Sequence, residues 1–168
     1  MVRKPPLIIR RGEIHDYLGM LIDFETKGKV KIDMRKYIDS ILVDLPEEYT
    51  RSAITPAADH LFDTNEECKK LDEVEGGKFR TIVAKILCLC KRGRPDIQNS
   101  TVFLTTRVKE PDMDDKKKLQ RVIWYLRGSR DLVITLESDD SGTIKWWVDA
   151  SFAVHNDYRS HTCETMSL

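Results

Sequence analysis

The amino-acid sequence predicts an α+β protein in which a β-hairpin, a helical segment and a second β-hairpin follow one another. Two apolar runs of extended type, 15–24 and 30–32, flank a turn that contains Gly28. Between residues 79 and 128 apolar side chains recur at helical spacing, whereas after Gly128 the period becomes that of strands. These observations predict the fold class and the order of its parts.

The composition is that of an ordinary globular protein. The chain has 168 residues, and its 28 basic residues equal its 28 acidic residues, so no net charge attracts nucleic acid to the protein as a whole. The first apolar run, residues 7–9, is too short for a signal peptide or a membrane span. The four cysteines are too few for a disulfide scaffold. We therefore expect an intracellular protein, cytoplasmic or nuclear, with no membrane partner.

The first elements are predicted to be the hairpin and a short helix. Gly19 lies inside the first apolar run, which indicates a bulge or a close approach of backbone. Asp33 has the residue type of a helix N-cap, and apolar residues at helical spacing follow it. Residues 45–77 are expected to form a long acidic loop, closed by Gly76 and Gly77.

Three helices are predicted after this loop. The clearest amphipathic helix spans 79–90, and its apolar positions are Phe79, Ile82, Val83, Ile86, Leu87 and Cys90. Two further helices are expected over 95–108, which Pro95 opens, and over 112–127, which begins with acidic residues.

Three strands complete the predicted fold. They span 132–136, 143–149 and 162–168, and a turn that ends at Gly142 joins the first two. The second strand is apolar and places Asp149 at its end. Because the sequence stops inside the last strand, we expect a truncated domain at this end of the chain.

Six short segments carry motifs whose order is informative. They are Tyr17-Leu18-Gly19-Met20, Thr55-Pro56-Ala57, Phe79-Arg80 with the helix up to Lys91, Gly93-Arg94-Pro95-Asp96-Ile97, Val122-Ile123-Trp124-Tyr125-Leu126-Arg127-Gly128-Ser129, and Val148-Asp149-Ala150-Ser151-Phe152-Ala153 followed by Arg159-Ser160-His161-Thr162. In this order they resemble the C-terminal part of the polymerase polyprotein of copia-type LTR retrotransposons. The resemblance covers nearly the whole chain, from residue 12 onward.

The resemblance implies a division into three parts. Residues 1–50 would be the end of a reverse transcriptase palm with a primer-grip-like hairpin, 51–142 a helical thumb and connection region, and 143–168 the truncated start of a ribonuclease H-like domain. In that family four carboxylates hold two Mg²⁺ ions, and Asp149 matches the first of them, as a vestigial catalytic and metal-binding residue. The other three have no counterpart here, so we expect the fragment to bind no Mg²⁺.

The sequence departs from the family where polymerisation would occur, because it contains no Y-x-D-D turn. We therefore expect a catalytically inactive fragment of an RNA-directed DNA polymerase and ribonuclease H polyprotein. Its partners would be a template–primer duplex of RNA or DNA, bound weakly, and the rest of the polyprotein. A domesticated, non-catalytic module that binds nucleic acid or a protein is the alternative. The missing carboxylates disfavour a self-standing ribonuclease H-like enzyme.

Two regions are candidates for nucleic-acid contact. By resemblance, the residues Tyr17, Gly19 and Met20 would lie near a primer terminus, although a hairpin packed on its own core fits the sequence equally well. Basic clusters on helices can neutralise phosphates without reading sequence. One cluster consists of Lys85, Lys91, Arg92 and Arg94, and the other of Lys116, Lys117, Lys118 and Arg121. A solvated helix face is the alternative for both.

Metal-binding patterns are weak in this sequence. His155, His161 and Cys163 lack the further ligands and the spacing of a zinc site. Cys88 and Cys90 project about 200° apart on a helix and cannot chelate one ion together. Cys90 is expected in the core.

Overall fold

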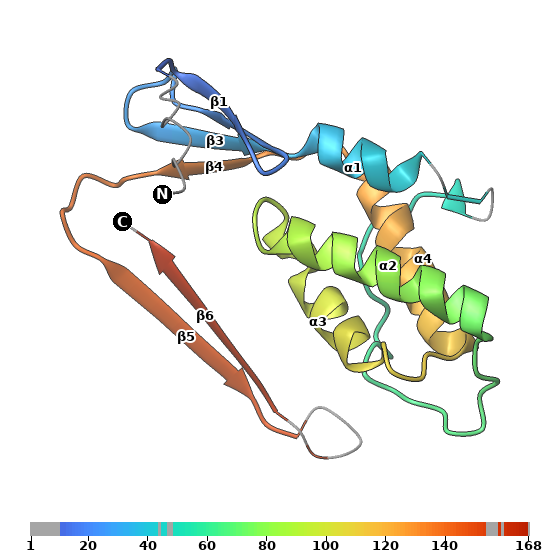
Figure 1. Cartoon of the computed structure of the whole chain (residues 1–168). Helices are drawn as coiled ribbons and strands as arrows, with labels where there is room; N and C mark the ends of the chain where they lie inside the picture. The colour runs from blue at the N-terminus through green and yellow to red at the C-terminus, as the bar shows by residue number, and fades with distance from the viewer. Residues whose placement is uncertain (1–10, 44, 47–48, 154–157, 159, 168) are drawn as a thin grey trace, which may run out of the picture.

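The computed structural model describes residues 11–43, 45–46, 49–153, 158 and 160–167. It contains a four-stranded antiparallel sheet, four α-helices and a separate β-hairpin among these residues, so the predicted α+β class is confirmed. Figure 1 shows the sheet and the hairpin at one end of the molecule and the helices at the other. None of the described helices is long and apolar enough to cross a membrane.

The predicted strand over 15–24 is in fact two strands, which corrects the sequence interpretation. β1 (Ile14–Tyr17) and β2 (Met20–Asp23) pair in antiparallel register, with Tyr17 opposite Met20. Leu18 and Gly19 between them both have positive φ, 51° and 80°, which is the geometry of a type I′ hairpin turn. Gly19 is therefore a turn residue and not a bulge.

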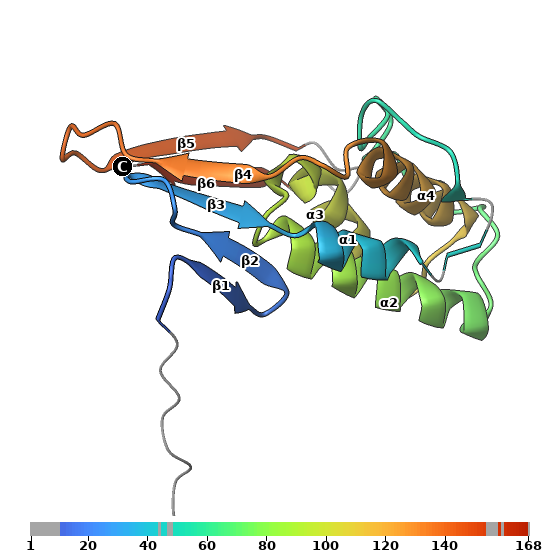
Figure 2. The same cartoon turned by 90° about the horizontal axis from the view of Figure 1, so that it is seen from above.

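The four-stranded sheet is built from strands that precede and follow the helical segment in the chain. β2 pairs with β3 (Lys29–Asp33), as predicted for the first hairpin, and β3 also pairs with β4 (Ile134–Glu137). β4 lies beside β3 in both views (Figures 1 and 2). The strand that follows β4 in the chain does not pair with β4. It belongs to a separate two-stranded sheet.

The helices are α1 (Arg35–Leu42), α2 (Glu73–Cys90), the 3₁₀ turn η2 (Pro95–Ile97), α3 (Gln98–Thr106) and α4 (Met113–Gly128). Their order matches the prediction, and most of their boundaries shift by only a few residues.

The start of α2 differs most from the prediction. The helix begins at Glu73 because the Asp72 side chain caps it, with Oδ1 accepting the backbone N–H of Glu75 at 2.8 Å. Gly76 and Gly77 therefore lie in the first turns of a helix and do not close a loop. Gly76 is buried, and a side chain there would meet the ring of Pro111 at 3.7 Å.

The start of α1 shifts by a smaller amount. Asp33 is the last residue of β3, and its Oδ1 accepts the backbone N–H of Arg35 at 2.8 Å. The predicted capping side chain is thus used, although it stands one position before the formal N-cap, Met34.

One hydrophobic core joins all four α-helices. Its most buried apolar side chains include Ile38, Val83, Ile86, Leu89, Cys90, Ile97, Phe103, Leu104, Leu119, Val122, Ile123 and Leu126. The predicted apolar stripe of the 79–90 helix supplies several of them, because positions three and four residues apart share one helix face. The burial of Cys90 is confirmed.

The last two strands form a hairpin of their own. β5 (Lys145–Ser151) pairs in antiparallel register with β6 (His161–Ser167), as predicted from the sequence. Every residue of β5 is exposed, and the indoles of Trp146 and Trp147 are 56% and 61% exposed. The hairpin therefore lacks an apolar layer on either face within the described chain.

Candidate nucleic-acid interface

The β1–β2 turn packs on α1 through Gly19 and Tyr37. A Cβ atom built on Gly19 would lie 3.2 Å from Tyr37 Cδ2, so a side chain at this position would crowd the aromatic ring. Gly19, Met20 and Tyr37 line a small cavity of about 230 Å³. Tyr17, by contrast, is 59% exposed at the end of β1. The turn therefore has one face held by α1 and one face open to solvent.

Tyr37 also connects this turn to α2. Its hydroxyl donates to the carbonyl oxygen of Lys85 at 3.4 Å. Burial, together with the neighbouring Cys88 thiol, raises the pKa of Tyr37 to about 12. Arg92 Nη1 in turn donates to the carbonyl oxygen of Cys88 at 3.2 Å. Four predicted contact residues, Gly19, Met20, Lys85 and Arg92, are thus brought together around one tyrosine that the sequence analysis did not single out.

The remaining two residues of this basic cluster lie in different surroundings. Lys91 is exposed at the end of α2. Arg94 is only 2% exposed: its Nη2 and Nε lie 2.7 and 2.9 Å from the Asp96 carboxylate, and its guanidinium carbon lies 5.6 Å from the centre of the Tyr125 ring. Although burial acts in the opposite direction, the Arg94 guanidinium holds the pKa of Asp96 below its ordinary value. The charge of Arg94 is therefore neutralised inside the protein by Asp96 and does not face a ligand from solvent.

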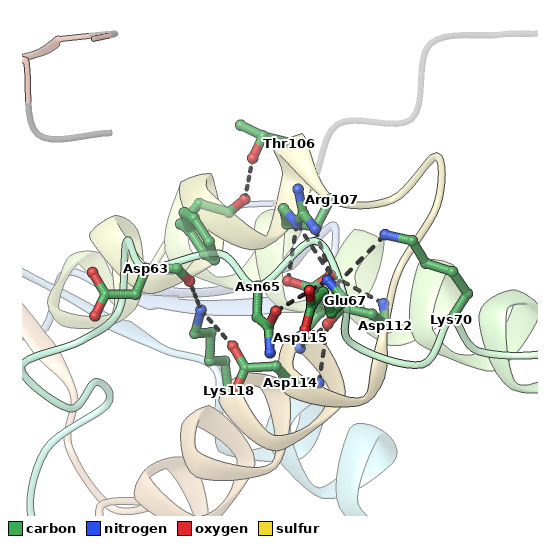
Figure 3. A network of polar contacts seen from close by, with 11 residues as sticks. Asp63, Asn65, Glu67, Lys70, Thr106, Arg107, Asp112, Asp114, Asp115 and Lys118 are labelled. Atoms are coloured by element: carbon green, nitrogen blue, oxygen red, sulfur yellow. Dashed lines mark hydrogen bonds and ion pairs between the residues drawn. The ribbon is translucent and has the colours of Figure 1, made fainter. Parts of the chain in front are cut away.

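The second basic cluster, of which Figure 3 shows Lys118, is divided in the same way at the start of α4. Lys118 is buried, donates to the carbonyl oxygen of Asp63, and pairs with Asp114 at 2.9 Å. Lys116 pairs with Glu75 of α2 at 2.9 Å. Both ammonium groups hold α4 to neighbouring segments and do not lie open on its surface.

An Arg–carboxylate network fixes the same end of α4. Arg107 binds Asp112 at 3.2 Å and Asp115 at 3.0 Å, while Lys70 lies 3.8 Å from Asp112 (Figure 3). The two carboxylates form a capping box with the first backbone N–H groups of the helix. Burial raises the pKa of Asp115, whereas backbone N–H groups lower that of Asp112 against the effect of burial. The network therefore orients the first turn of α4 rigidly.

Three members of this cluster, Lys117, Lys118 and Arg121, line one groove, which Asp114 lines as well. The groove measures about 190 Å³ and also includes His60, Leu61 and Trp124 in its lining. Lys117 is exposed, and no ion pair to it occurs within the described residues. It lies one turn before Arg121, so both cations occupy one face of α4.

Arg121 is held in place by the loop that precedes α2. Its Nη2 donates to Thr55 Oγ1 at 2.8 Å, whereas its Nε is buried and has no hydrogen-bond partner in the described part of the chain. Trp124 lies one turn further, with the Arg51 guanidinium carbon 5.7 Å from its ring centre. The Thr55-Pro56-Ala57 motif thus supports a cation, a relation that only the fold reveals.

The predicted carboxylate Asp149 stands apart from both basic regions. It is exposed on β5 opposite Cys163, and its Oδ1 accepts the backbone N–H of Ala150 at 2.9 Å. No group of three or more His, Cys, Asp or Glu side chains that could hold a metal occurs among the described residues, and His155 lies outside them. The described residues around Asp149 do not fit a two-Mg²⁺ site, which needs several converging carboxylates.

Comparison with known proteins gives one relation. A transposon Ty5-1 protein of Saccharomyces cerevisiae is 24% identical to the chain over 148 residues, which are 86% of this chain and 47% of the yeast protein. The chain thus spans about half the length of that relative, and the relation is distant. No protein-family profile matches the chain. No solved structure matches it either.

Proposed function

We propose that the chain is part of a copia-type retrotransposon polymerase polyprotein. In this proposal residues 1–50 are the end of the reverse transcriptase palm, 51–142 the thumb and connection, and 143–168 the start of ribonuclease H. Two observations support it: the ordered motifs along the sequence and the distant relation to a yeast transposon protein over 148 residues.

The role that the geometry supports best is sequence-independent contact with the phosphates of a template–primer duplex. The observation that carries it is the pair Lys117 and Arg121 on one face of α4, beside the groove lined by Trp124. Two cations one helical turn apart can each neutralise a phosphate of one strand. The Thr55 contact holds Arg121 without neutralising its charge. The capping box fixes the helix turn from which Lys117 projects.

The proposed fragment does not polymerise or cleave nucleic acid. Metal-dependent phosphoryl transfer needs several converging carboxylates, and the sequence has no Y-x-D-D turn while Asp149 stands without such neighbours among the described residues. We expect no extension of an oligo(dT) primer on poly(A) by the purified chain with Mg²⁺. Extension that survives repurification would overturn this part of the proposal.

The binding role is tested with a fluorescent RNA–DNA duplex and the double variant Lys117→Gln/Arg121→Gln. The control Lys27→Gln/Lys109→Gln removes the same charge from two exposed lysines elsewhere. We expect weak binding by the wild type, with log K falling linearly as log salt rises, and a slope that decreases by about 2 in the double variant because two phosphate contacts are lost. The control should keep the wild-type slope.

A third variant separates charge from local packing. Arg121→Lys removes the guanidinium that holds Thr55 but keeps the positive charge, so binding should remain close to that of the wild type. Equal binding by the wild type and by Lys117→Gln/Arg121→Gln, or binding that does not depend on salt, would contradict the phosphate role. In that case a module that binds a protein would be the better interpretation.

A further inference from the structure

The groove beside α4 offers more than contact with phosphates alone requires. Pro56, Ala57 and Ala58 line it together with the buried Leu61, so it has an apolar wall as well as a charged one. Its volume of about 190 Å³ is smaller than the range of about 300–1,000 Å³ that is typical of pockets for drug-sized ligands. It therefore suits a single small ring system and not a helix of a partner protein.

Two positive charges at this groove have no carboxylate to neutralise them within the described chain. Arg121 donates from Nη2 to the neutral hydroxyl of Thr55 at 2.8 Å, and its buried Nε has no hydrogen-bond partner there. Lys117 is exposed and forms no ion pair with a described residue. Asp114, the only carboxylate among the described lining residues, pairs with Lys118 at 2.9 Å (Figure 3). The charges of this groove therefore favour an anionic ligand.

Trp124 places an aromatic ring beside these charges. Lys117, Arg121 and Trp124 are spaced at i, i+4 and i+7, so they share one face of α4 and span about 10 Å along its axis. The guanidinium carbon of Arg51 lies 5.7 Å from the centre of the Trp124 ring, which adds a third cation nearby. Proteins hold single-stranded nucleic acid by this combination, in which cations meet the phosphates and aromatic rings stack with the bases.

We infer that the groove holds one unpaired nucleotide, with its phosphate between Lys117 and Arg121 and its base against Trp124. A base inside a duplex already pairs and stacks, so it cannot enter the hollow without leaving the helix. The occupant is therefore a nucleotide of a single-stranded extension next to the duplex. This inference rests on the proposed phosphate contact and adds to it the recognition of an unpaired base. Because every base has a π face, the contact should depend little on sequence.

Binding of the wild-type chain to two RNA–DNA duplexes tests this inference. One duplex carries a short thymidine overhang, and the other carries an abasic overhang with the same number of phosphates. Both should give the same slope of log K against log salt, because they offer equal charge. The thymidine overhang should nevertheless bind about tenfold more tightly at every salt concentration, because only its bases can stack on an aromatic ring.

The fluorescence of Trp124 reports where the base lies. The chain contains three tryptophans, and the double variant Trp146→Phe/Trp147→Phe leaves Trp124 as the only one. Both replaced side chains are more than half exposed, so the fold should tolerate the exchange. The thymidine overhang should quench the remaining fluorescence, since stacking places the base against the indole. The abasic overhang should leave it nearly unchanged.

Two variants of Trp124 separate the ring from the charges. Trp124→Leu should abolish the preference for the thymidine overhang and keep the wild-type salt slope, whereas Trp124→Phe, which retains a ring, should keep part of the preference. A preference that survives Trp124→Leu, or equal binding of both overhangs by the wild type, would overturn the stacking site. The phosphate role would still stand if Lys117→Gln/Arg121→Gln lowers the salt slope. Failure of the wild type to bind either duplex would overturn both proposals.

Discussion

Arg94 binds Ser129 through two hydrogen bonds, although 35 positions separate the two residues in the chain. Arg94 Nη1 donates to the Ser129 carbonyl oxygen at 3.0 Å and Nη2 donates to its Oγ at 2.6 Å. The same guanidinium pairs with Asp96. The Arg94-Pro95-Asp96 motif thus joins the start of η2 to the end of α4, from which the chain continues into β4. Its role in this structure is to hold the helices together.

Arg94→Gln should lower the free energy of unfolding by about 2 to 4 kcal/mol, because a buried ion pair loses one partner and Ser129 loses a donor. Urea denaturation followed by circular dichroism measures the change. Lys91→Gln is the matched control, since Lys91 is exposed near the same helix end, and its effect should stay within about 0.5 kcal/mol. Equal effects of the two variants would contradict an internal role for Arg94.

Gly19→Ala should destabilise the protein more than Gly28→Ala. Both glycines have nearly the same φ, 80° and 79°, so an alanine at either position costs about 1 kcal/mol of backbone strain. At Gly28 nothing lies within 4 Å of the added Cβ, whereas at Gly19 it meets the Tyr37 ring. Thermal unfolding of both variants measures the difference, which should vanish when each is made in a Tyr37→Ala background. A difference that persists there would mean that Tyr37 is not its cause.

Leu18→Asn should stabilise the hairpin by about 1 kcal/mol. Leu18 is 60% exposed and has φ 51°, a conformation that leucine adopts at a cost and asparagine tolerates. Little buried area is lost in the exchange. Chemical denaturation compares the variant with the wild type, and Leu18→Ala, which keeps the strain, serves as the control. A stability gain by Leu18→Ala as large as that by Leu18→Asn would contradict the strain explanation.

Tyr37 should be among the last tyrosines to ionise. The folded-state pKa of about 12 lies above the ordinary value of about 10, so the folded protein holds the phenol proton more tightly than the unfolded chain. The stability that Tyr37 contributes is therefore complete below pH 10 and is lost as the pH rises through 12. The tyrosinate absorbance of the wild type minus that of Tyr37→Phe should titrate near pH 12. A midpoint near pH 10 would show that the ring is not held between the β1–β2 turn and α2.

Sequence periodicity predicted the helical core well, because burial repeats at helical spacing along α2 and α4. It failed where the decisive neighbour is distant in the chain. The sequence gives no sign that Arg94 binds Ser129 or that Lys118 is held by Asp63, whereas the neighbouring Lys117 remains exposed. Charge clusters in a sequence therefore overstate a binding surface, since tertiary contacts neutralise part of them.

The predictions for Gly76 and Gly19 were wrong for a related reason. Gly76 was expected to end a loop, as glycine disfavours helices, yet the Asp72 cap and the contact with Pro111 place it inside α2. Gly19 was expected within a strand, because it lies inside an apolar run of extended type. Tertiary packing decided both positions against the local preference.

The β5–β6 hairpin should exchange its amide hydrogens faster than α2 at a concentration where the chain is monomeric. Residues 147–149 lie in a two-stranded sheet whose β5 residues are all exposed, and an isolated hairpin is marginal in water. Residues 82–87 of α2 include Val83 and Ile86, which are almost fully buried, so their amides open only with the core. We expect protection factors at residues 147–149 to be about a hundredfold lower than those at 82–87, measured by hydrogen exchange and mass spectrometry.

Glu164→Lys should leave exchange in α2 unchanged and so serves as a control for global unfolding. Equal protection of 147–149 and 82–87 in the monomer would show that the hairpin is held by contacts beyond its own ladder.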